Sequence, residues 1–245
     1  MSVTLTRGKV TLQYLRDPAS VDTIDLARIV AQLEEGTVNL EPLYWLAHNP
    51  VTLYDRIVLA TERETGRCIG FLGAQDGATA ADETYFYLRA AFVAERARGK
   101  GLLSRMMAML SLRALANDEL PDAIAMRTSR AMLFHSLRGI AKRIPGITFY
   151  PAPADQPTNL RTADLARRVA HKVGHGIRFS TGTGALRGGR LGYGHALDDL
   201  AREHRIDGLP GTDFAPPDQV LALLDLRDVE EQTLEEHARS ILRPR

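Results

Sequence analysis

The sequence predicts a mixed α/β fold in which helices cover a sheet. Short runs alternate apolar and polar residues, as half-buried strands do, for example over 9–15. Other runs repeat apolar residues at helical spacing, for example over 102–116. The order of runs is strand, two helices, three strands, helix, strand, helix, strand, which is typical of a mixed layer architecture. We expect this core to close near Tyr150.

The predicted elements of the first half begin with a strand in which Val10, Leu12 and Tyr14 alternate with polar neighbours. A helix capped by Ser20 and ended by Gly36 follows, and Asn49-Pro50 breaks a second, short helix. The expected bounds are Lys9–Leu15 (strand), 20–36 and Glu41–Ala47 (helices), Arg56–Thr61 and Cys68–Ala74 (a hairpin), and Glu83–Val93 (a long strand).

After the long strand we expect a helix with a buried apolar stripe, a strand, a second helix and a last short strand. Their bounds are Leu102–Ala116, Ala123–Thr128, Ser129–Arg143 and Ile147–Tyr150. Residues 1–150 are therefore predicted to form one domain.

Residues 151–245 exceed what this core needs, and we expect a linker plus a C-terminal α/β extension. Pro151–Pro157 has the composition of a linker, and Gly174–Gly194 holds eight glycines and is predicted to be a lid-like loop. The extension's other expected elements are helices at Leu160–Val173, Ala196–His204 and Val229–Leu242 and a strand at Gln219–Leu226. The late strand either extends the main sheet or binds a second subunit in a homodimer.

Composition excludes several classes of protein. The 245 residues are 44% hydrophobic, which is enough for a buried core, and the formal net charge of +1 gives no chain-wide case for binding nucleic acid. A single cysteine, Cys68, cannot form an internal disulfide or a cysteine zinc cage, so we expect no metal. No apolar run approaches the ~20 residues of a membrane helix, so we expect a soluble, cytoplasmic protein without membrane contact.

The stretch from Val93 to Ser104 carries the best motif in the chain. A strand runs into Arg98-Gly99-Lys100-Gly101-Leu102-Leu103-Ser104, which opens a helix. Glycines allow the backbone to approach a ligand closely, and the first amides of a helix are unpaired and point outward. The helix dipole adds about half a positive charge there, so a pyrophosphate is favoured at this end. A tight strand-to-helix turn without a ligand remains the alternative interpretation of the glycines alone.

At this stretch the sequence resembles the GNAT superfamily of acyl-CoA-dependent N-acyltransferases. Their signature is Arg or Gln, two residues, Gly, one residue, and Gly or Ala, between a strand and a helix. Two registers fit, one beginning at Arg96 and one at Arg98. We prefer the register from Arg98 because of its spacing from Val93, although Leu103 then replaces the last Gly or Ala. The resemblance covers about residues 10–150 and implies a largely antiparallel central sheet flanked by helices.

The resemblance implies acetyl-CoA or another acyl-CoA as co-substrate. Backbone groups near Phe92 and Val93 would hold the pantetheine arm, and amides from Arg98 to Ser104 would hold the pyrophosphate. The acceptor amine attacks the thioester directly, so Cys68 is not needed as a nucleophile and is expected in the core. The implied cofactor-binding residues are Phe92, Val93, Arg98, Gly99, Lys100, Gly101, Leu103 and Ser104.

The same resemblance suggests where a general acid and a general base would lie. His135 falls where many relatives carry a tyrosine acid, and a histidine can protonate a thiolate near neutral pH; a histidine on a helix face without a catalytic role is the alternative, and Ser136 is a weaker donor. Tyr87 stands about where acidic-base relatives carry a glutamate, which leaves Glu83 as the nearest carboxylate of the strand. Because Glu83, Tyr85 and Tyr87 share a polar face of this strand, we expect a substrate cleft there, with the tyrosines as its walls.

Three functions fit these observations. The first, which we favour, is an N-acyltransferase that acts on a small-molecule amine, with acetyl as the preferred acyl group. The second is a catalytically silent CoA-binding sensor or scaffold. The third is an acyltransferase whose acceptor is a protein or an aminoacyl-RNA, docked by the basic block Arg96–Arg143, where ten basic residues face three acidic ones.

Overall fold

The structure is a computed structural model of the 245-residue chain. It describes residues 2–18, 29, 32, 51–128, 131–153, 156–174, 177–187 and 219–243. The chain forms two compact units and passes between them four times, twice within a strand. Unit 1 comprises Met1–Asp76, Leu88–Leu120 and Glu231–Arg245, and unit 2 comprises Gly77–Tyr87 and Pro121–Glu230.

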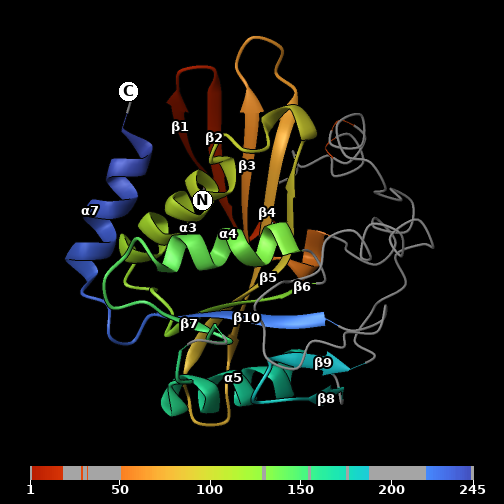
Figure 1. Ribbon diagram of the computed structural model, residues 1–245. Coiled ribbons are helices and arrows are strands. Elements are labelled where there is room, and N and C mark those ends of the chain that lie inside the picture. Colours follow the sequence, from red (N-terminus) through yellow and green to blue (C-terminus); the bar gives the residue numbers. More distant parts are fainter. Residues whose placement is uncertain are drawn as a thin grey trace. The chain divides into compact units, whose positions relative to one another are not determined.

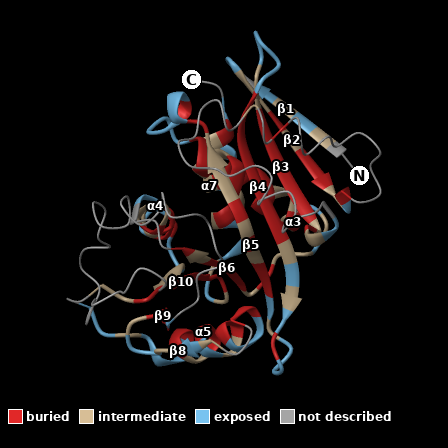
Figure 2. Ribbon diagram, turned by 90° about the vertical axis from the view of Figure 1, so that its right-hand side faces the viewer, coloured by how far each residue is buried: buried red, intermediate tan, exposed pale blue. Residues whose placement is uncertain are grey.

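Unit 1 is built on an antiparallel sheet in which consecutive strands are neighbours. Its strands are β1 (Ser2–Arg7), β2 (Val10–Arg16), β3 (Arg56–Glu62), β4 (Cys68–Ala78) and β5 (Thr84–Val93), in that spatial order. β1 pairs with β2, β2 with β3 and β3 with β4, each antiparallel. Figure 2 shows β3 and β4 buried along most of their length, as expected of strands rich in apolar residues.

The described part of unit 1 also contains two α-helices. α3 (Leu102–Leu115) packs on β2 and β3 with the apolar stripe that its helical spacing predicts, including Met106 and Leu110. α7 (Glu231–Leu242) lies beside α3 (Figure 1) and buries Leu234, Ala238 and Leu242, which recur every fourth residue. No helix among the described residues is long and apolar enough to cross a membrane.

Unit 2 is centred on a strand that comes late in the sequence. β10 (Gln219–Asp225) pairs antiparallel with the whole of β6 (Ala123–Thr128) on one side. On its other side it pairs with β7 (Thr148–Tyr150) and β9 (Ala185–Arg187), and β8 (Arg178–Phe179) pairs with β9. Six of the seven residues of β10 are buried, because both faces of this sheet are covered.

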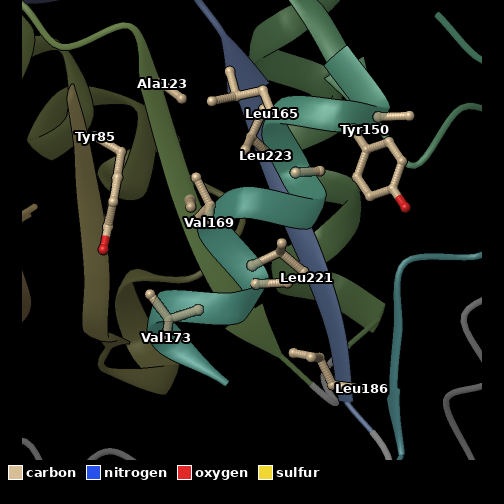
Figure 3. Close-up of a cluster of buried hydrophobic side chains, with 13 residues drawn as sticks. Tyr85, Ala123, Tyr150, Leu165, Val169, Val173, Leu186, Leu221 and Leu223 are labelled. Carbon is tan, nitrogen blue, oxygen red and sulfur yellow. The ribbon is translucent and has the colours of Figure 1, made fainter. Parts of the chain in front are cut away.

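Helices cover the sheet of unit 2 on opposite faces. α4 (Ala131–Ala141) packs on β6, β7 and β10, and the ring of its Phe134 meets the ring of Phe149 edge-on with centroids 5.1 Å apart. α5 (Leu160–Val173) packs on β7, β8 and β10, where Tyr150 joins a cluster with Leu165 and Val169 (Figure 3). Phe149 and Tyr150 are neighbours in one strand and point to opposite faces, so the two helices do as well.

The described elements confirm most of the predicted ones. The expected mixed α/β class and largely antiparallel strands are present, and β6 and α5 have the predicted bounds. β1, η2 (Val51–Leu53), β8 and β9 were not predicted. The predicted helices at Glu41–Ala47 and Ala196–His204 lie outside the described residues, as does most of the helix predicted from Ser20.

The C-terminal segment contributes to both units. β10 and α5 belong to unit 2, and α7 belongs to unit 1. Part of the glycine-rich segment predicted as a lid forms the β8–β9 hairpin, which is joined to β10. The remainder of that segment, 188–194, lies outside the described residues.

Candidate functional site

The strand-to-helix junction of unit 1 begins where β5 ends at Val93. The amide of Ala94 donates a hydrogen bond of 2.9 Å to the carbonyl of Ile69, which fixes the strand's end to β4. A single 3-10 turn, η3 (Glu95–Ala97), follows, and its Ala97 is buried. The end of β5 and the turn after it are therefore anchored in the core, and the glycines follow directly.

Gly99 and Gly101 both adopt a left-handed backbone conformation with φ of 70°. A residue other than glycine loses about 1–2 kcal/mol in this conformation because its Cβ crowds the carbonyl oxygen. A Cβ atom built at either position would meet nothing within 4 Å. The backbone of this loop is thus open to a ligand, and the glycines are required by its conformation rather than by crowding.

Gly101 is the N-cap of α3, and no side chain caps that end. The first amides of a helix have no acceptor within the helix, and here the first turn also contains no acidic residue. Leu102 and Leu103 are buried, so their side chains point into unit 1 and leave the exposed surface of the turn to the backbone. This arrangement is suited to a pyrophosphate, and it accommodates Leu103 at the position where the signature has Gly or Ala.

Two cationic side chains fold back over the loop. Arg98 Nε donates to the carbonyl of Val93 at 3.2 Å, and Lys100 Nζ donates to the carbonyl of Arg96 at 2.8 Å. Both side chains are exposed, and the bonds hold their charges beside the open glycines. The loop therefore combines helix amides, a helix dipole and fixed positive charge, each of which favours an anion.

A glycine that the sequence reasoning missed lets α3 approach the sheet. A Cβ on Gly70 of β4 would lie 3.1 Å from Leu102 Cδ2 and 3.1 Å from Met106 Sδ. The small residue therefore lets the first turn of α3 pack tightly on the strand. Glycine inside an apolar strand is a sequence signal of such close approach. Nearby, Cys68 is buried, as expected of a core residue.

Glu83, a candidate base, lies in unit 2 within a cluster of charges. Its carboxylate accepts hydrogen bonds from Arg168 Nε at 2.7 Å and from the hydroxyl of Thr79 at 2.6 Å, and it lies 3.5 Å from Arg227 Nη1. The hydrogen bond from Arg168 is the main cause that holds the pKa of Glu83 below its usual value. A carboxylate bound in this way is a weaker proton acceptor than a free one.

The tyrosines of β5 do not line an open cleft in the way that we expected. Tyr85 is buried and belongs to the hydrophobic cluster under α5, where Figure 3 shows it with Val169 and Leu223. Its pKa is raised because burial disfavours the phenolate. Tyr87 is half-buried at the margin of the same cluster. The polar alternation of this strand therefore reflects packing beneath a helix at Tyr85, which the sequence reasoning had set aside.

His135, the candidate acid, lies on α4 in unit 2. It is half-buried with its Nδ1 buried, and its ring stands edge-on to that of Phe134 with centroids 5.5 Å apart. The hydroxyl of Ser136 donates to the carbonyl of Met132 at 2.8 Å, one turn earlier in the helix. The proton of the Ser136 hydroxyl is therefore engaged within the helix.

The predicted site residues therefore fall into two groups. The residues predicted to bind the cofactor are all in unit 1, and the candidate acid and bases are all in unit 2. Tyr44 and Trp45, which we considered as walls of an acceptor pocket, lie outside the described residues. Within the described part of the chain, no group of three or more His, Cys, Asp or Glu side chains is arranged to hold a metal ion.

Solved structures similar to this chain include acetyltransferases. The NatC complex bound to Gag peptide and CoA has a TM-score of 0.38 at 15% identity, over 53% of this chain and 83% of that chain. An acetyltransferase of Trypanosoma brucei has 0.36 at 18%, over 55% and 90%. A GNAT family acetyltransferase of Brucella melitensis in complex with acetyl-CoA has 0.34 at 12%, over 47% and 74%. No model of a protein family matches the sequence, and no curated protein does.

Proposed function

We propose that this protein is an acyl-CoA-dependent N-acyltransferase that transfers an acetyl group, or a longer acyl group, to the amine of a small molecule. One observation carries the proposal: β5 leads through left-handed Gly99 and Gly101 into the uncapped start of α3, with Arg98 and Lys100 held beside the loop. Exposed amides at a helix N-terminus with adjacent cations form a site for a pyrophosphate, which CoA contains.

In the proposed reaction the acceptor amine attacks the thioester carbonyl directly. The carbon–sulfur bond breaks, the thiolate of CoA takes a proton, and the nitrogen loses one. Amides from Arg98 to Ser104 hold the pyrophosphate, and backbone groups near Phe92 and Val93 hold the pantetheine. The protein contributes mainly proximity, which can supply about 7–11 kcal/mol of the barrier. His135 is proposed to protonate the thiolate, with Tyr87 contacting the acceptor.

Thermal unfolding with and without acetyl-CoA, CoA and a long-chain acyl-CoA tests the donor site. A ligand at 100 times its Kd stabilises the folded state by about 2.7 kcal/mol, which shifts the midpoint measurably. Gly101→Glu is expected to abolish this shift, because the carboxylate would repel the pyrophosphate. Gly66→Glu is a matched control, since Gly66 has a φ of 66°, open space around it and a place in the same unit.

The control separates loss of binding from backbone strain. Equal loss of the shift in both variants would indicate general damage, and persistence of the shift in Gly101→Glu would contradict the pyrophosphate site. If no CoA species stabilises the folded wild-type protein, the junction is only a structural turn and the acyltransferase proposal is wrong.

Steady-state kinetics with a panel of amines tests the proposed acid. General acid catalysis contributes typically about 100–10,000-fold, so His135→Gln should lower kcat by a factor in that range while the affinity for CoA stays unchanged. Ser136→Ala, which alters the adjacent side chain of the same helix, should leave kcat within about threefold. Unchanged kcat in His135→Gln would remove the histidine from the mechanism.

The pairing of Glu83 supports a second candidate, a protein that binds CoA without turnover. The bonds to Arg168 and Thr79 leave this carboxylate poorly suited to accept a proton. Stabilisation by CoA together with no turnover on small amines, peptides or aminoacyl-RNA would favour this candidate. If turnover occurs, Glu83→Gln decides whether the carboxylate contributes, and strong salt dependence of KM would indicate an RNA acceptor.

A further inference from the structure

Unit 1 contains a groove that the proposed function does not use. It lies between β1, α3 and α7 and has a volume of about 660 Å³. Its lining along β1 and α3 is mostly apolar, with Val3, Leu5, Met109 and Leu112, and becomes mostly polar along α7. Small-molecule sites have volumes of about 300–1,000 Å³ and combine apolar walls with polar groups that orient the ligand.

One cation in this groove has a buried nitrogen. Arg113, in the last turn of α3, lines the cavity, and its Nε is buried. Among the residues that the structure describes, nothing accepts a hydrogen bond from this Nε, and Arg113 forms no ion pair with them. A buried guanidinium nitrogen without an acceptor is costly, so the site favours a ligand that brings an anionic oxygen.

The acidic groups of α7 limit which anion fits. Glu235 and Arg239 pair with each other at 2.6 Å, and their side chains are 40% and 61% exposed. Glu231 is exposed at the same rim, where water solvates it. Two carboxylates at the rim disfavour a ligand with several negative charges, such as a phosphate, more than one with a single charge. A carboxylate also matches the fork of an arginine in shape.

We propose that the groove between β1, α3 and α7 binds a small amphipathic monocarboxylate, such as a medium-chain fatty acid. The carboxylate accepts hydrogen bonds from Arg113, and the apolar body packs against Val3, Leu5, Met109 and Leu112. Occupation removes apolar surface from water and supplies the acceptor that the guanidinium lacks. This inference does not depend on the proposed acyltransferase activity, because none of these residues belongs to the glycine loop.

Calorimetric titration of the full chain with decanoate, in the presence of saturating decanoyl-CoA, tests the proposal. The decanoyl chain of this thioester occupies the proposed acyl site and keeps free decanoate out of it. Arg113→Met should weaken binding about tenfold or more, because a hydrogen bond between charged groups is lost. Arg138→Met is the matched control, since Arg138 also lies in the last turn of a helix but in unit 2, and it should change Kd less than about twofold.

A measurement on the wild-type protein keeps the test independent of how well the variants fold. Decanamide has the same chain without the charge and should bind at least about tenfold more weakly than decanoate. The proposal is overturned if decanoate does not bind the folded wild-type protein, if decanamide binds equally well, or if Arg113→Met binds decanoate like the wild type. Binding that appears only when decanoyl-CoA is omitted would assign decanoate to the acyl site and also overturn it.

Discussion

Arg56 and Asp76 form a two-point ion pair between β3 and β4, in which Nε and Nη2 of the guanidinium each donate to a carboxylate oxygen at 2.7 Å. The arginine is only 3% exposed, and its Nη1 also donates to Glu119 at 2.9 Å and lies 3.3 Å from the hydroxyl of Tyr14. Burial alone would lower the pKa of Arg56, but the hydrogen bond and charge of Asp76 raise it above its ordinary value. The buried charge is therefore compensated within unit 1.

Removing this arginine should be costly. Arg56→Met leaves Asp76 and Glu119 without their shared partner, and breaking a buried ion pair costs about 3–5 kcal/mol. We expect a loss near the lower end of that range, because Asp76 is 40% exposed. Urea unfolding measures it. Arg16→Met, which removes a more exposed partner of the same Glu119, should cost less than about 1 kcal/mol. Equal losses would contradict the argument from burial.

The charge cluster around Glu83 predicts a dependence of stability on pH. Because the pKa of Glu83 is lower in the folded protein than its ordinary value of 4.5, the cluster's contribution is fully present above that value. It is lost as the pH falls through the lowered native pKa. In urea unfolding at a series of acidic pH values, Glu83→Gln should flatten this part of the profile. Asp228→Asn, which breaks an exposed pair with Arg161, should leave the slope nearly unchanged.

The hydrophobic cluster under α5 predicts a contrast between two leucines of that helix. Leu165 is fully buried in the cluster, whereas Leu160 is 82% exposed at the helix's first turn. Leu165→Ala should lower the free energy of unfolding by about 2–5 kcal/mol, since it removes buried methyl groups and leaves a cavity. Leu160→Ala should change it by less than about 0.5 kcal/mol. A small effect of Leu165→Ala would show that the cluster does not stabilise the fold.

Two left-handed glycines should differ in their tolerance of alanine. A Cβ on Gly146, whose φ is 87°, would lie 2.5 Å from the carbonyl oxygen of Asp228, while one on Gly8, whose φ is 55°, would meet nothing within 4 Å. Gly8→Ala carries only the conformational penalty of about 1–2 kcal/mol. Gly146→Ala adds a backbone clash and should cost clearly more in thermal unfolding. Similar losses would mean that the loop around Asp228 moves aside easily.

The sequence predicted local structure well because periodicity is a local property. The apolar spacing of α5 and the alternation of β2 report directly which face of each element is buried. The strand–glycine–helix junction could also be predicted, because glycine is the residue that adopts a left-handed turn without steric cost. β1 was missed although Val3 and Leu5 alternate with Ser2, Thr4 and Thr6, and β8 was missed because it comprises only two residues.

Partners distant in the sequence were not predictable in the same way. Arg127 donates to Gln219 across 92 positions, between β6 and β10, and nothing in either segment specifies the other. The face of β5 that carries Tyr85 is polar in composition, yet α5 covers it, since a tyrosine ring packs as well as it binds. The charge partners of Glu83 come from α5 and from the segment that follows β10 for the same reason.

The sequence by itself determined the class of fold, the bounds of most elements and the open glycine loop between β5 and α3, because each depends on residues within a few positions of one another. Only the tertiary structure decided that β10 lies between β6 and β7, that Glu83 is held by two arginines, and that Arg113 faces an apolar groove beside α7. These features involve residues that are far apart in the sequence. Their burial and their charge pairing are determined together, when the whole chain folds.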